Sequence, residues 1–220
     1  MPAVVAAPLV LALDAALAGC SAGMVQGGVV LAERLASGAR GHAAALPAMV
    51  QDVLAEAGTA ATGLGLVAVT IGPGSFTGLR AALSLAHGIG LASGVAVVGV
   101  TVGEALLVRM PGRAFWAAID SRRGRVFLEH EGAVQGYALD ALPRPEGDVC
   151  VAGDAAGPVA AAWRLAGVDA LLLDAVRPTP AGVAAAAVRR AGLCLPPRPA
   201  QPLYVDPPEA RPGAFRPEPA

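Results

Sequence analysis

Apolar runs of strand length alternate along this chain with apolar positions at helical spacing, which predicts a mixed α/β protein. Residues 66–99 show this pattern most clearly. A β-branched apolar run covers residues 66–71, Gly72-Pro73-Gly74 interrupt it, and apolar residues then recur at helical spacing as far as Gly94. A second apolar run covers residues 95–100. The stretch predicts a strand, a helix and a strand, joined by a right-handed crossover in a partly parallel sheet.

The loop that begins this helix, residues 72–80, allows two interpretations. Ser75 or Thr77 can cap the helix, because a hydroxyl accepts a hydrogen bond from a free amide of the first turn. A glycine-rich turn at a helix N-terminus can also bind an anion through its backbone amides. The loop lacks the residues and spacings of a Walker A loop, a dinucleotide fingerprint or a nucleophile elbow. A tight strand-to-helix turn and an anion site both stay open.

The rest of the pattern predicts similar elements on both sides of Pro111-Gly112, where we place a lobe boundary. Residues 26–28 read as a hairpin turn, and Pro47 fits the first turn of an amphipathic helix. Besides the unit above, the predicted strands cover residues 9–14, 20–25, 28–33, 115–120, 126–131, 149–152 and 170–173, and the predicted helices residues 43–57, 101–110, 157–166 and 180–191.

The two halves of the chain repeat one plan. The first strand ends at Asp14, the first strand after the boundary ends at Asp120, and each acid is followed by a turn and a returning strand. We therefore expect two lobes, residues 1–110 and 111–200, followed by a proline-rich tail over residues 201–220.

Composition limits the classes of function. The 220 residues are 55% hydrophobic and carry a net charge of −1, so any contact with nucleic acid is expected to depend on a partner. Cys20, Cys150 and Cys194 form neither a metal spacing nor a disulfide framework, which fits a reduced cytoplasm. The apolar start lacks a positive region and Asp14 interrupts it, so we expect no signal peptide and no membrane helix.

Four charged residues at the two turns are candidates for nucleotide or tRNA contacts. Asp14 and Asp120 end strands, where isolated acids are commonly turn residues but can also hold a nucleotide or a metal. The alanines after Asp14 would crowd a phosphate, because each Cβ keeps the backbone at a distance. Arg122 and Arg123 are either a solvated hairpin tip or a phosphate or tRNA contact.

A longer motif resembles a known family. The chain reads Gly72-Pro73-Gly74-Ser75-Phe76-Thr77-Gly78-Leu79-Arg80, then a small-residue helix and Val98-Gly99-Val100-Thr101. This run closely resembles the signature of the TsaB family. Residues 119–126 and the segment around Tyr204 resemble it too, although Asp206 replaces the family's arginine. The resemblance implies an α/β, actin/sugar-kinase-like fold with two lobes built on duplicated mixed-sheet domains.

The resemblance also implies a function. TsaB proteins are non-catalytic partners that support the transferase TsaD in making threonylcarbamoyladenosine in tRNA, with TsaE and tRNA joining through the complex and no cofactor in TsaB itself. Two helices of the first lobe would bind TsaD, unless their apolar faces only cover the protein's own sheet. The expected interface comprises Leu46, Met49, Val50, Val53, Leu54, Phe76, Leu79, Leu83 and Ala86.

Catalysis by this chain itself is not expected. In TsaD the helix after the second strand of the crossover unit carries a metal-binding pair of histidines, and those positions fall here at Val102 and Leu106, which cannot bind a metal. Three alternatives stay open: a phosphotransferase or ATPase using Asp14 and Asp120, a metallopeptidase, which would need a metal this chain cannot hold through that pair, and a homodimeric scaffold. Arg80, in the first turn of its helix, should have a carboxylate or carbonyl partner.

Overall fold

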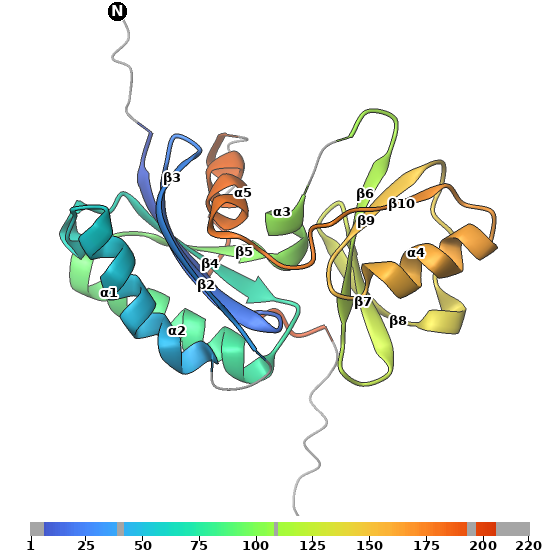
Figure 1. The fold of residues 1–220 in the computed structure, drawn as a ribbon, viewed down its shortest axis with the longest axis horizontal. Helices are drawn as coiled ribbons and strands as arrows, with labels where there is room; N and C mark the ends of the chain where they lie inside the picture. Colours follow the sequence, from blue (N-terminus) through green and yellow to red (C-terminus); the bar gives the residue numbers. More distant parts are fainter. Residues whose placement is uncertain (1–6, 39–41, 108–109, 193–196, 206–220) are drawn as a thin grey trace, which may run out of the picture.

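The computed structural model describes residues 7–38, 42–107, 110–192 and 197–205. They form two lobes, each built on a five-stranded mixed sheet (Figure 1). The first lobe contains β1 (Leu9–Asp14), β2 (Gly19–Gln26), β3 (Val29–Ser37), η1 (His42–Ala45), α1 (Leu46–Glu56), η2 (Ala61–Gly63), β4 (Leu66–Gly72), α2 (Phe76–Ser93), β5 (Val97–Thr101) and α3 (Val102–Leu106).

The second lobe has its own sheet and one covering helix, α4, which packs on β9 and β10 (Figure 1). Its core is built around Trp163, whose side chain is buried and whose indole N–H donates to the carbonyl of Pro143 at 2.8 Å. The elements of this lobe are β6 (Ala114–Asp120), β7 (Arg125–His130), β8 (Ala133–Ala138), η3 (Leu139–Ala141), β9 (Val149–Ala152), α4 (Ala156–Leu165) and β10 (Ala170–Leu172). The chain then continues to a last helix, α5 (Pro180–Gly192).

The two sheets share one topology. The first has the order β3-β2-β1-β4-β5 and the second the order β8-β7-β6-β9-β10. In each, three successive strands form an antiparallel meander and two further strands join in parallel. The predicted duplicated α/β fold of the actin/sugar-kinase type is therefore confirmed.

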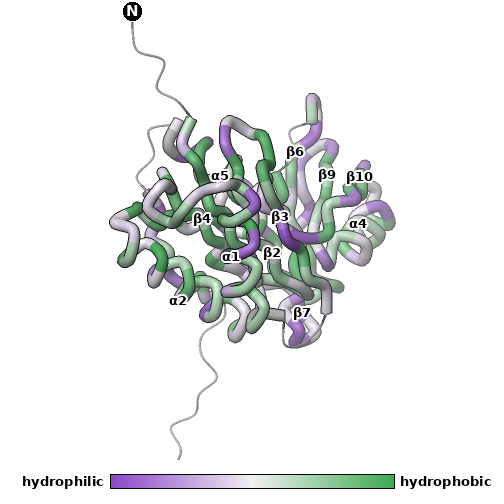
Figure 2. Tube along the Cα trace, turned by 60° about the vertical axis from the view of Figure 1, so that its left-hand side comes forward, coloured by the Kyte–Doolittle hydropathy of each residue, from purple (hydrophilic) through white to green (hydrophobic). Residues whose placement is uncertain are grey.

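The central strand of the first sheet, β1, is buried on both faces. Along β1, Leu11 and Leu13 lie in the cluster under α1 and α2, whereas Val10 and Ala12 lie in the cluster under α5. Successive residues of a strand point to opposite faces, so a strand covered on both faces is a continuous apolar run. Figure 2 shows these hydrophobic strands inside the helices, with hydrophilic residues at the tip beside β7.

The last helix belongs to the first lobe in space. The sequence placed residues 111–200 together in the second lobe, but α5 packs on β1 and β2. Residues 197–205 then lie along the first lobe, where the amide of Leu203 donates to Ile71 O at 2.8 Å and that of Gly99 to Arg198 O at 2.9 Å. Part of the expected tail is thus structural, and its residues from 206 onward lie outside the described residues.

One predicted helix is much shorter than expected. The helix foreseen over residues 101–110 is α3, which ends at Leu106 because Leu107 leaves the helical conformation and the chain crosses to the second lobe. A bridge between Met110 and Arg113 precedes β6. Cys20 and Cys150 are buried thiols, and Cys194 is outside the described residues. No described helix has the length and apolarity that a bilayer span requires.

Candidate functional site

The loop over residues 72–80 is closed against the neighbouring turn of the first lobe. Ser75 is the N-cap of α2, and its hydroxyl accepts from the amide of Gly78 at 3.2 Å. The amide of Ser75 donates to Ala16 O at 2.6 Å. A side chain at Gly78 would overlap the carbonyl oxygen of Ala15. These contacts use loop amides that an anion would need, so the geometry fits a tight turn.

Asp14 has a structural role at the same turn. The residue is 3% exposed, and its carboxylate accepts from the hydroxyl of Thr70 at 2.6 Å and from the amide of Ala16 at 3.1 Å. Burial raises the pKa of Asp14 to about 6, although these hydrogen bonds and Arg177 lower it in part. A side chain bound in this way holds the turn that separates β1 from β2.

A cleft of about 510 Å³ lies between the lobes and is lined by residues of both. At its rim the Arg80 guanidinium stacks on the Phe76 ring, 3.7 Å from the centroid, and donates to the hydroxyl of Tyr204 at 3.0 Å. The expectation of a carboxylate or carbonyl partner for Arg80 is corrected, because an aromatic face and a phenol oxygen take this place. Phe76 and Tyr204 are both more than half exposed.

The second turn faces the cleft with a network of charges. Arg122 lies 3.5 Å from Asp120 and 2.9 Å from Asp154, which accepts from the amide of Asp120 at 2.8 Å. Burial raises the pKa of Asp154, while the Asp120 amide and Arg122 offset part of this effect. Arg123 is at the exposed tip. Asp14, Asp120, Arg122 and Arg123 are thus divided between two turns, and Arg122 is engaged in ion pairs.

Most of the expected interface residues pack inside the protein. The side chains that recur at helical spacing on α1 and α2 cover the first sheet, which is the alternative that the sequence left open, except that Leu79 lies in the apolar cluster between the lobes. Leu54 is half-buried and Phe76 is exposed. The buried residues of the expected interface are Leu46, Met49, Val50, Val53, Leu79, Leu83 and Ala86. A partner that binds these helices would therefore contact other, exposed positions.

Helix α3 has apolar residues where the resemblance places the metal-binding histidines of TsaD. Val102 and Leu106 are buried in the apolar cluster between the lobes. Among the described residues, no group of three or more histidines, cysteines or acids is placed to hold a metal ion.

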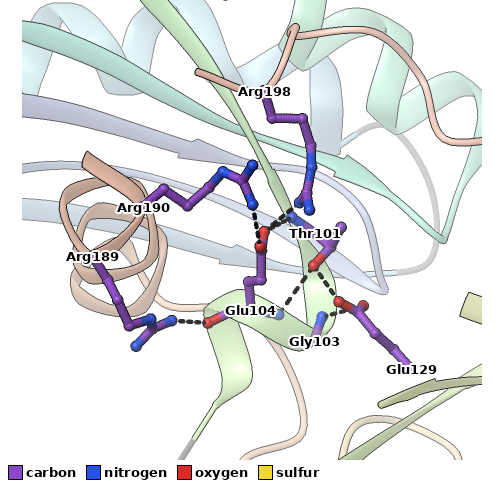
Figure 3. Close-up of polar contacts among 7 residues, drawn as sticks. All are labelled: Thr101, Gly103, Glu104, Glu129, Arg189, Arg190 and Arg198. Carbon is purple, nitrogen blue, oxygen red and sulfur yellow. Dashed lines mark hydrogen bonds and ion pairs between the residues drawn. The ribbon is translucent and has the colours of Figure 1, made fainter. Parts of the chain in front are cut away.

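A polar cluster at the start of α3 joins distant parts of the chain (Figure 3). Glu104 accepts from the amide of Thr101 at 3.0 Å and from Arg190 at 3.0 Å, and it also pairs with Arg198. Burial alone would raise the pKa of Glu104, but the Thr101 amide and the two arginines together hold it below its ordinary value. Glu129 reaches the same helix turn from β7.

Sequence reasoning did not identify this cluster. The available signal was the Thr101-x-x-Glu104 spacing of a capping box, in which each residue bonds the backbone of the other. A single acid at position 129 within an apolar strand was a second signal. The arginines come from residues more than 80 positions further along the chain, which no local pattern connects.

Comparisons with known proteins agree on one family. The family model described as "TsaD: tRNA N6-adenosine threonylcarbamoyltransferase" matches residues 26–146. An uncharacterized protein of Mycobacterium tuberculosis is 35% identical, over 93% of this chain and 95% of that relative. The tRNA threonylcarbamoyladenosine biosynthesis protein TsaB of Escherichia coli is 32% identical over 62% of this chain and 63% of its own length.

Solved structures show the same fold. YeaZ from Pseudomonas aeruginosa superposes with a TM-score of 0.72 at 24% identity, covering 90% of this chain and 99% of that chain. A second Pseudomonas aeruginosa structure, of an uncharacterized protein with similarity to peptidase YeaZ, gives a TM-score of 0.73 at 23% identity, with 90% and 100% covered.

Proposed function

The chain belongs to the family of TsaD-type proteins and is a homologue of TsaB, and from this premise we propose that it is a non-catalytic partner of a TsaD-type transferase. Its family takes part in tRNA threonylcarbamoyladenosine biosynthesis. In this proposal the chain stabilises and activates the transferase, while tRNA and the further partner TsaE join through the complex.

The observation that carries the proposal is the apolar character of α3. Val102 and Leu106 stand where the resemblance places the metal-binding histidines of the transferase, and both side chains are buried. A chain that lacks these ligands needs a second subunit to carry out the transfer. The closed turn at Asp14 and Ser75 argues in the same direction, because it leaves little room for a phosphate beside Ala16. It therefore disfavours a phosphotransferase or ATPase.

The outer faces of α1 and α2 are the proposed contact surface. Their inward side chains are used by the chain's own core, so a partner would meet exposed positions such as Ser84, Gly88 and Leu91 on α2. Leu91 is 89% exposed, and a side chain built at Gly88 would meet no atom within 4 Å. Small residues on an outer face allow a partner helix to approach closely, as in a helical bundle.

Substitution of Gly88 by arginine should weaken binding to the TsaD-type protein of the same cell at least about tenfold, because a long charged side chain would separate the two helices. Removing a helical glycine does not weaken α2 itself. Binding would be measured by titration and by co-elution from a sizing column, with circular dichroism as the check on folding.

Ala161→Arg is the matched control, since Ala161 is exposed on α4 of the other lobe. It adds the same charge and should leave binding unchanged. If wild type and Gly88→Arg bind the transferase with equal affinity, the partner does not contact this face of α2. If the wild-type chain instead elutes as a complex with itself and never with the transferase, the homodimeric scaffold replaces the proposed function.

A further inference from the structure

Glu129 crosses the boundary between the lobes. It lies on β7 of the second lobe and is 3% exposed, and its carboxyl group reaches the first turn of α3, the continuation of β5 (Figure 3). One carboxyl oxygen accepts from the hydroxyl of Thr101 and the other from the amide of Gly103 at 2.8 Å. These two bonds attach the central hairpin of one lobe directly to the backbone of the other.

The local sequence is fitted to this contact. A side chain at Gly103 would overlap the carboxyl group of Glu129, so the group can approach the amide because residue 103 is glycine. The Thr101 hydroxyl already accepts from the Glu104 amide at 3.1 Å. Its proton is therefore directed to one oxygen of Glu129, and a protonated carboxyl group can still accept this bond as well as the one from the Gly103 amide.

The arginines near Glu129 form ion pairs with Glu104 and not with Glu129. From α3, Glu104 repels it, while Arg198 attracts it from the segment after α5. Glu104 is itself paired with Arg190 and Arg198, and Arg189 of α5 donates to the Glu104 carbonyl. Within the part of the chain that the structure describes, Glu129 has no ion pair of its own.

The strands beside Glu129 add no compensating charge at its level. Its partners in register are Ala117 on β6 and Val134 on β8. The next residues of the chain, His130 and Glu131, contact each other at 3.9 Å, and His130 bonds the carbonyl of Phe115 at 2.8 Å. Burial raises the pKa of Glu129 to about 7, and the bonds from Thr101 and Gly103 lower it only in part.

We propose that Glu129 is a proton-operated latch between the lobes, which holds β7 on the start of α3 while the carboxyl group is protonated and loosens when it ionises. A buried carboxylate without a counter-ion gains free energy by reaching water. Water is near, because a cavity of about 930 Å³ opens beside it, lined by Gly103, Glu129 and Arg189 among others. The latch does not depend on the proposed function.

The sign follows from linkage. The pKa of Glu129 is higher when the latch is closed than in water, so the closed state binds more protons and is favoured at low pH. The closed state has its full stability advantage over the open state below about pH 4.5, the ordinary pKa of a glutamate. This advantage falls as the pH rises toward 7. Above that pH the latch stays weakened.

The test uses the full chain and hydrogen exchange of the Gly103 amide, expressed as a protection factor corrected for the intrinsic rate at each pH. Wild-type protection should fall at least about tenfold between pH 5.5 and 8.5. Glu129→Gln keeps the shape without the charge, so its protection should not change with pH. Glu131→Gln, at a site whose side chain is 86% exposed, is the control and should behave as wild type.

Constant wild-type protection, or the same pH dependence in Glu129→Gln, would overturn the latch. If the glutamine variant does not fold, the wild-type carboxyl carbon of Glu129 is titrated by NMR instead. A midpoint near 7, shared by the Gly103 amide signal, supports the proposal. A midpoint near 4.5 rejects it.

Discussion

Replacing Gly78 by alanine is expected to lower the free energy of unfolding by about 2–4 kcal/mol, although alanine is the better helix former. The reason is the close approach of α2 to the first turn. The added methyl group would overlap the backbone carbonyl of Ala15, and a backbone atom cannot move aside as a flexible side chain can. Helix α2 would have to shift outward, which would loosen the packing of Leu79 and Leu83. Urea unfolding at neutral pH measures the change.

Gly88 supplies a control on the same helix. A methyl group there meets no atom within 4 Å, so only the helix propensity changes. Gly88→Ala should therefore stabilise the chain by about 1 kcal/mol. The two substitutions are chemically identical and should have opposite signs. If Gly78→Ala does not destabilise the chain relative to Gly88→Ala, α2 and the turn are not in this close contact.

This contrast shows what the sequence pattern could and could not predict. The local signals of α2 were readable: Ser75 was one of two candidate N-caps, and Gly94 ends the helix in a left-handed conformation with φ of 71°. The difference between Gly78 and Gly88 was not readable. It depends on which face of the helix meets the turn after β1, and that is fixed by tertiary packing.

Periodicity predicts an apolar face but not its partner. The spacing of Met49 and Val53 on α1 identified a helix correctly, and both side chains pack on the protein's own sheet. The same limit applies to α5, whose bounds were predicted within one residue but whose place on the first lobe was not. Strand β8 was missed, because Gln135 and Gly136 give it a weak strand pattern and it lies at the edge of its sheet.

Contacts between residues far apart in the sequence account for the rest. Arg80 and Tyr204 are 124 positions apart, and Glu104 and Arg198 are 94 apart. The sequence contains each of these residues, but only the folded chain brings the partners together. The contacts at the cleft and in the polar cluster therefore could not be predicted from the sequence.

Glu104→Gln is expected to destabilise the protein by about 2–4 kcal/mol at pH 7. The substitution preserves the shape and removes the charge that Arg190 and Arg198 share. The three side chains are only 16–23% exposed, so the arginines would be left poorly solvated and without this counter-ion. Because α3, α5 and the segment around Arg198 meet at this carboxylate, their connection should weaken together. Urea unfolding of both forms gives the difference.

Glu56→Gln tests whether any broken pair has this effect. Glu56 pairs with Arg34 at 2.7 Å, but both side chains are 40–49% exposed, so the expected loss of stability is below about 1 kcal/mol.

The pH dependence of the Glu104→Gln effect gives a second test. The pKa of Glu104 is lowered, so its contribution is present above pH 4.5 and is lost as the pH falls through the folded value. Wild type and Glu104→Gln should thus converge in acid, the opposite of the direction expected for Glu129, which binds the first turn of α3 from β7. A difference that stays constant down to acid pH would mean that shape, and not the charge of Glu104, holds these segments together.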